Sequence, residues 1–303
     1  MNKIFIAGLF AAIILGIIFP FGDRISFVLT ALLAILLFFN FYDIDFNFKH
    51  FIKKEFFIGL VFCLVVLPIL VFFMTKSLQI EFRLGLFLIA VTPTAIGSSI
   101  IVKLVKGDVN FSVAYTVIYN FLSIAAYPVL LKIFFGNSEV AIPVTNIIIN
   151  LSIIILIPFI LATVLKKTGF INKIISRVSK FVSYFFLLVI YIAVSSSVQN
   201  LKGISPVSLI VIIAFTFAVA LLYFLSGLIL GKGLYNKKTM SISMGQKNTG
   251  LCILVTMTNF SPISAIPATI YIIVHHLINS VLIFIFNRIL QVKTDSDDKS
   301  QDL

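Results

Sequence analysis

The stretch with the most reactive side chains is SMGQKNTGL, at positions 243–251. It contains Lys247, the only charged residue between Thr239 and Asn287. Ser243 and Lys247 are four residues apart and would share one face of a helix, where a neutral lysine could activate the serine as a nucleophile. A charged lysine could instead donate hydrogen bonds to carbonyl groups that a broken helix exposes. The stretch therefore raises the question of why an apolar segment contains a lone lysine.

Hydroxyl groups gather around a second stretch, TPTAIGSSIIVKLVKG, at positions 92–107. Ser98 and Ser99 follow a glycine directly, and Ser112 and Thr116 are four residues apart, on one face of the next predicted helix. Hydroxyl oxygens are hard ligands that suit a small cation.

Both stretches lie in a chain that is too apolar for a soluble domain. Of its 303 residues, 60% are hydrophobic and 11% are charged, and the mean hydropathy is +1.17. Apolar segments of about 20 residues recur, each long enough to cross a bilayer as a helix. The sequence thus predicts an all-α polytopic membrane protein with ten transmembrane helices, at 4–21, 26–42, 56–75, 84–105, 109–134, 143–165, 181–199, 206–230, 239–259 and 264–287.

The net charge of +12 follows the predicted loops and does not indicate a nucleic-acid surface. With a cytoplasmic N-terminus, 17 of the 23 Lys and Arg residues fall in inside segments and 5 in outside segments, and the remaining one is Lys247. This distribution predicts a protein of the cytoplasmic membrane with both termini in the cytoplasm, and the lipid bilayer as its partner. The two cysteines, Cys63 and Cys252, lie in apolar segments and predict neither a disulfide nor a metal site.

The ten segments divide into two five-helix repeats, residues 1–139 and 140–290, followed by a polar tail, 291–303, that we expect to be disordered. Because five is odd, the repeats would be inverted in the membrane. The fourth segment of each repeat is interrupted by small and polar residues. Paired interruptions of this kind indicate a transporter binding site, although simple kinks at Pro93 and Gly245 would give the same local pattern.

At these interruptions the sequence resembles the bile acid:sodium symporter family. The similar segments are TPTAIGSSIIVKLVKGDVNFSVAYT, GQKNTGLCILVTMTNFSPISAIPATIYIIVHHLINS and FFNFYDIDFNFKHF. The resemblance implies a panel of helices 1, 2, 6 and 7 and a core of helices 3, 4, 5, 8, 9 and 10, in which the broken helices 4 and 9 cross. It also implies alternating-access transport of small organic anions, usually with two sodium ions and no other cofactor.

The positions that match the family's sodium ligands are altered here. One family site corresponds to Ser98, Ser99, Ser112, Thr116 and Ser243, with Ser243 in place of a glutamate. Without that carboxylate, the resemblance implies at most a weak sodium site at the first four of these residues. The other corresponds to Ser243, Lys247 and Cys63, with Lys247 and Cys63 in place of glutamines. Because a lysine stands where a cation should bind, we expect sodium dependence to be reduced or absent. A sodium-coupled symporter with non-standard ion ligands is the alternative.

The role of Lys247 has three interpretations. Its ammonium could replace the lost sodium ion. The side chain could instead have a purely structural role and hold the broken helices together, or it could extend to the membrane interface. A lysine at bilayer depth costs roughly 2.5–3.5 kcal/mol and needs a compensating partner. All eleven acidic residues lie at segment ends, in loops or in the tail. Exposed carbonyl groups and an anionic substrate are therefore the expected partners.

The resemblance also implies the substrate contacts. Asn248 and Thr249 match a family Asn-Ser pair after the ninth-helix break, and Thr94 and Gly97 lie at the fourth-helix break. Helix N-termini at such breaks offer free N–H groups to an anion. His275 matches a family histidine that faces the cavity, although a buried histidine is often only a hydrogen-bonded core residue.

An intramembrane hydrolase is the alternative from another class. Ser243 and Lys247 are its candidate catalytic pair. The predicted helices contain no pair of carboxylates, no H-E-x-x-H motif and no cysteine cluster. Aspartyl and zinc proteases are thereby excluded. The sequence favours a transporter, not an enzyme.

Overall fold

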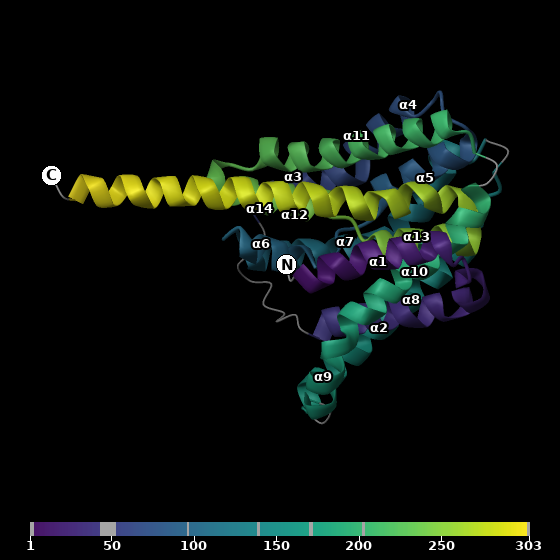
Figure 1. Cartoon of the computed structure of the whole chain (residues 1–303), viewed down its shortest axis with the longest axis horizontal. Helices are drawn as coiled ribbons and strands as arrows, with labels where there is room; N and C mark the ends of the chain where they lie inside the picture. The colour runs from purple at the N-terminus through teal and green to yellow at the C-terminus, as the bar shows by residue number, and fades with distance from the viewer. Residues whose placement is uncertain are drawn as a thin grey trace.

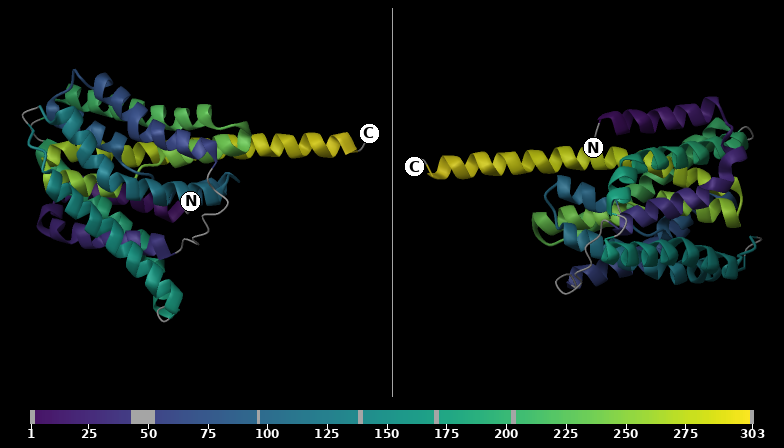
Figure 2. Two further views of the ribbon diagram at one scale, coloured as in Figure 1. Left: turned by 180° about the vertical axis from the view of Figure 1, so that it is seen from behind. Right: turned by 90° about the horizontal axis from the view of Figure 1, so that it is seen from below.

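The computed structural model describes residues 3–42, 53–95, 97–137, 140–169, 172–201 and 204–301. Within these ranges every regular element is helical, and the single isolated bridge joins Thr94 to Lys247. Most helices run along one long axis, as expected for a bundle that crosses a membrane (Figure 1). Helix α1 begins and α14 ends at the same end of this bundle (Figure 2).

Each apolar segment predicted in the first repeat corresponds to one or more helical elements. The third is continuous but contains a π-helical turn, η3, just before Pro68, whose missing N–H disturbs the regular hydrogen-bond ladder. The fourth is two helices, α5 and α6. The elements are α1 (Lys3–Ile18), η1 (Gly22–Val28), α2 (Leu29–Tyr42), α3 (Lys54–Val61), η3 (Phe62–Val66), α4 (Leu67–Met74), α5 (Ile80–Val91), α6 (Ser98–Leu104) and α7 (Val109–Phe135).

In the predicted second repeat, the interrupted segment is again two helices, α12 and α13. The elements are α8 (Val144–Thr168), α9 (Asn172–Val178), η4 (Ser179–Phe181), α10 (Val182–Leu201), α11 (Pro206–Leu230), α12 (Gly233–Gly245), α13 (Thr249–Asn259), η5 (Pro262–Ala265) and α14 (Ile266–Gln301).

The disordered tail that we expected from residue 291 remains a prediction. Helix α14 continues to Gln301, and Asp302 and Leu303 lie outside the described residues. No proline or glycine comes after Pro267, so nothing in the sequence terminates the helix.

Five described helices are long and apolar enough to cross a membrane, and they fall at 54–74, 109–135, 144–168, 206–230 and 262–289. A sixth is added if the pair 172–181 and 184–196, which is bent by 47°, is taken as one span. The chain is therefore a multi-pass membrane protein. The full set of ten spans and the inverted repeats remain predictions.

The helices pack in two groups. Helix α1 lies along α10, and α2 lies along α8. In the other group α11 packs on α12 and α14, and α6 packs on α7 and α12. Figure 1 shows α2, α8, α9 and α10 on one side of the bundle, with α3, α4, α5 and α11 on the other. Helix α7 also packs on α8, across the two groups, and the predicted division into panel and core remains a prediction.

The closest helix contact in the second group joins α11 to α12. A Cβ atom on Gly227 would overlap the backbone of Met240 and Ser241, so only glycine permits this approach. The Ser241 hydroxyl also donates a hydrogen bond of 2.9 Å to the Phe224 carbonyl. This contact fixes α12, and with it the link that leads into α13.

Candidate binding site at the two helix breaks

The breaks between α5 and α6 and between α12 and α13 lie against each other. The Asn248 N–H donates to the Pro93 carbonyl and the Ala95 N–H donates to the Gln246 carbonyl, each at 2.8 Å. These two bonds satisfy backbone groups that the interrupted helices leave without partners, which membrane depth requires. The predicted meeting of the two stretches is thus present as a short antiparallel bridge.

Side chains strengthen this contact. The Thr94 hydroxyl donates to the Ser243 carbonyl, and the Asn120 amide donates to the Thr94 carbonyl at 3.2 Å. On the other side, the Tyr271 hydroxyl donates to the Gly245 carbonyl at 2.7 Å. Helices α7 and α14 therefore hold the two breaks from either side.

The Lys247 side chain turns inward and is fully buried. Its ammonium donates to the Thr92 carbonyl at 3.0 Å and to the Ala90 carbonyl at 3.2 Å, with a longer contact of 3.4 Å to the Tyr119 hydroxyl. Its Nζ atom also lies 3.8 Å from the ring centroid of Tyr223. Burial rules out the interpretation in which Lys247 extends to the membrane interface.

No carboxylate among the described residues balances this buried charge. Asp108 forms an ion pair with Lys53, elsewhere on the surface. The partners of Lys247 are instead the C-terminal end of α5, where the helix dipole is negative, and the faces of two tyrosine rings. This environment is the one a bound cation would need.

The other residues of the second altered ion site lie around the same group. Tyr119 donates from its hydroxyl to the Cys63 carbonyl at 3.1 Å, which connects Cys63 to the ammonium of Lys247. The Ser243 hydroxyl is buried and has no hydrogen-bond partner among the described residues. In particular, Ser243 and Lys247 do not bond to each other, so the structure lacks the contact that a Ser-Lys catalytic pair needs.

Three of the four predicted sodium ligands lie together. The Ser98 hydroxyl is 3.0 Å from that of Ser112 and 3.2 Å from that of Thr116, and all three are buried. Asn120, one turn beyond Thr116, has a buried side-chain oxygen without a partner in the described structure. The fourth predicted ligand, Ser99, is half-buried. The cluster offers neutral oxygens alone, which bind a cation less strongly than carboxylates.

Asn248 is the one residue from 238 to 256 that is not buried. Its side-chain oxygen accepts from the Leu251 N–H at 3.2 Å and so caps the N-terminus of α13. The capping leaves its amide N–H groups for another partner. Gly97 is half-buried on the facing break, whereas Thr94 and Thr249 are buried and support the link.

His275 lies on the face of α14 that is directed at the link. Tyr271 and Asn279, four residues to either side, bond respectively to the Gly245 carbonyl and, at 3.2 Å, to the Gln246 side chain. The His275 ring is buried between them, and its Nδ1 atom has no hydrogen-bond partner in the described part of the chain. The structure thus brings His275 to the same link as Asn248.

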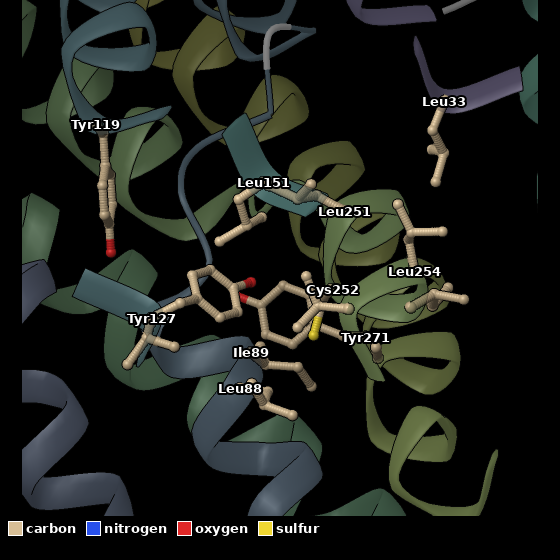
Figure 3. Close-up of a cluster of buried hydrophobic side chains, with 14 of the residues drawn as sticks. Leu33, Leu88, Ile89, Tyr119, Tyr127, Leu151, Leu251, Cys252, Leu254 and Tyr271 are labelled. Atoms are coloured by element: carbon tan, nitrogen blue, oxygen red, sulfur yellow. The ribbon is translucent and has the colours of Figure 1, made fainter. Parts of the chain in front are cut away.

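Tyr223 is a residue that sequence reasoning missed. Tyr223 donates to the Ala90 carbonyl at 2.7 Å, which helps to fix the carbonyl that Lys247 binds. Figure 3 shows Tyr119, Tyr127 and Tyr271 in one buried cluster with Cys252. The sequence did contain a signal for this contact. A tyrosine in an apolar helix predicts a hydrogen bond to another group, because a buried hydroxyl needs a partner.

Comparison with known proteins assigns the class. The Sodium Bile acid symporter family model matches residues 26–204, more than half of the chain. Over 300 residues the chain is 26% identical to the Uncharacterized sodium-dependent transporter YocS of Bacillus subtilis (strain 168), covering 96% of this chain and 92% of that protein. Over 242 residues it is 24% identical to the Probable sodium/metabolite cotransporter BASS1, chloroplastic, of Arabidopsis thaliana, covering 78% of this chain and 60% of that protein.

The chain therefore belongs to the Sodium Bile acid symporter family. It is a membrane transporter and not an enzyme, as the sequence predicted. The resemblance found in the interrupted segments is confirmed.

Proposed function

We propose that this protein carries small organic anions across the cytoplasmic membrane by alternating access. The substrate binds beside the meeting helix breaks, between the predicted core and panel. The accessible amide of Asn248 and the N-terminus of α13 supply hydrogen-bond donors for a carboxylate. Gly97, Thr94, Thr249 and His275 complete the proposed substrate site, with Thr94 and Thr249 shaping it from within the core.

The second part of the proposal is that transport depends little on sodium. The observation that carries it is the position of the Lys247 ammonium, 3.0 Å and 3.2 Å from the carbonyl oxygens of Thr92 and Ala90. These are cation-binding groups at the end of α5, and Lys247 already occupies them. A sodium ion beside it would meet like-charge repulsion that low dielectric strengthens.

A single weak ion site is the remaining place for sodium. The hydroxyls of Ser98, Ser112 and Thr116 already bond to one another, so an ion would have to replace those bonds. Without the family's glutamate, the site offers no negative charge to offset the loss of the ion's hydration shell. We therefore expect no steep dependence on two ions.

The names of both relatives associate them with sodium, so the proposal is tested by direct comparison of cations. The purified protein is reconstituted in liposomes, and uptake of pantoate, 2-oxo acids and bile acids is measured in sodium, potassium or choline buffers. We expect uptake of at least one organic anion, at similar rates in the three buffers. A steep rise with sodium would contradict the role given to Lys247. Failure of every organic anion would contradict the substrate class.

A further inference from the structure

Residues 166–184, which extend from the last residues of α8 to the first residues of α10, have an unusual charge pattern. They contain Lys166, Lys167, Lys173, Arg177 and Lys180 and no acidic residue. The side chains of Lys167, Arg177 and Lys180 are exposed. We call this segment the basic bend.

The basic bend leaves the direction of the bundle. Residues 172–181 are bent by 47° from residues 184–196. Figure 1 shows α9 projecting sideways from the body of the protein, beyond the end of α2. Helix α9 therefore does not continue the direction of α10.

Exposed apolar side chains accompany the basic ones. Ile174 is 59% exposed, Phe181 is 55% exposed and Tyr184 is 63% exposed. Phe181 directly follows Lys180, so an apolar ring and an ammonium group project from neighbouring positions. This combination is typical of segments that lie in the interface of an anionic bilayer, with rings among the acyl chains and cations at the phosphates.

We propose that the basic bend binds the headgroups of anionic phospholipids and holds α9 at the bilayer surface. Lys167, Arg177 and Lys180 contact the phosphate groups, and Phe181 and Tyr184 enter the acyl region beneath them. The bend connects α8 to α10, both part of the predicted panel. Anionic lipid therefore acts as a specific ligand of this part of the transporter.

The chain contains no tryptophan, so one introduced indole reports its own surroundings without background. Phe181→Trp protein is placed in nanodiscs that contain phosphatidylcholine and phosphatidylglycerol, with either lipid carrying brominated acyl chains. Brominated lipids quench tryptophan on contact. At equal mole fractions we expect phosphatidylglycerol to be enriched about fivefold at position 181, the gain that one basic residue near an anionic surface confers.

The control indole is Val207→Trp, at a site that is 70% exposed at the start of α11 and outside the basic bend. There the two lipids should quench equally. Adding Lys167→Gln, Arg177→Gln and Lys180→Gln should abolish the enrichment at position 181. Adding Lys103→Gln, Lys232→Gln and Lys237→Gln, which removes the same charge elsewhere, should preserve it.

Three results would overturn the proposal. Equal quenching by the two lipids at position 181 would show apolar insertion without headgroup recognition. Absence of quenching would show that the bend does not contact the bilayer. Enrichment that survives the triple substitution would assign the lipid to other residues. Arg177→Gln alone, with a partial loss expected, serves if the triple variant does not fold.

Discussion

The ammonium nitrogen of Lys247 lies 3.0 Å from the carbonyl oxygen of Thr92, the residue at which α5 has just ended. The break between α12 and α13 thus supplies a cation to the C-terminal end of α5, where the helix dipole is negative. The contact joins residues 155 positions apart, and it turns an interruption that would otherwise expose backbone groups into a satisfied, buried junction.

Substitution Lys247→Met should destabilise the protein by about 1–3 kcal/mol, because it leaves buried carbonyls without a donor. The midpoint of thermal unfolding in detergent measures this effect. Lys237→Met, on the exposed part of α12, is the matched control and should change stability by about 0.5 kcal/mol or less. Equal midpoints for both variants would show that the junction does not need Lys247.

Restoring the family's ion ligands should restore a sodium response. The triple variant Ser243→Glu, Lys247→Gln and Cys63→Gln replaces the ammonium and returns one carboxylate and two amides. We expect uptake by this variant to rise with sodium, unlike uptake by the unmodified protein. The control is Ser243→Glu with Cys63→Gln alone, in which Lys247 would pair with the new carboxylate and keep sodium out. If uptake by the control rises with sodium as much as uptake by the triple variant, Lys247 does not occupy the sodium site.

Asn248→Ser should weaken substrate binding while preserving the fold. Serine can still cap α13, but it lacks the amide donors. Losing one hydrogen bond costs about 0.5–1.5 kcal/mol, and more when the partner is charged. Binding is measured by calorimetry with whichever anion the uptake screen identifies. Asn259→Ser, at the other end of α13, should leave the affinity unchanged, and an unchanged affinity for Asn248→Ser would remove Asn248 from the site.

Gly227→Ala should be more destabilising than Gly97→Ala. A methyl group at position 227 would collide with the backbone of α12, whereas at position 97 the nearest atom, in Gln246, would be 3.8 Å away. Overpacking of this kind costs about 1–3 kcal/mol. Thermal unfolding of the two variants measures the difference. If Gly227→Ala and the unmodified protein have the same midpoint of thermal unfolding, α11 and α12 do not pack as closely as described.

The predicted orientation is tested by cysteine labelling in intact cells. Cys63 and Cys252 are both fully buried, so the unmodified protein should react little with an impermeant thiol reagent. Lys76→Cys, in a predicted outside segment, should be labelled. Lys237→Cys, in a predicted inside segment, should be labelled only after the cells are opened. The reverse pattern would invert the topology.

The sequence by itself determined the class of this protein. Its apolar segments leave too little polar surface for a soluble domain, and each is long enough for a helix that satisfies its own backbone. The positions of both helix breaks were also predictable, because Pro93 cannot donate a hydrogen bond and the glycines beside Lys247 weaken a helix. The bend into α9 was not predicted, since it involves residues outside the apolar segments, where hydropathy carries little information about helix ends.

Only the tertiary structure shows which groups surround Lys247. Local sequence permits a catalytic base, an ion substitute or a side chain that extends to the interface, because all three need only a lysine near a break. The choice depends on which groups α5, α7 and α11 bring to the ammonium. They bring the carbonyls of Ala90 and Thr92 and the rings of Tyr119 and Tyr223, all distant in sequence. Contacts between helices that far apart are set by packing, which no local pattern encodes.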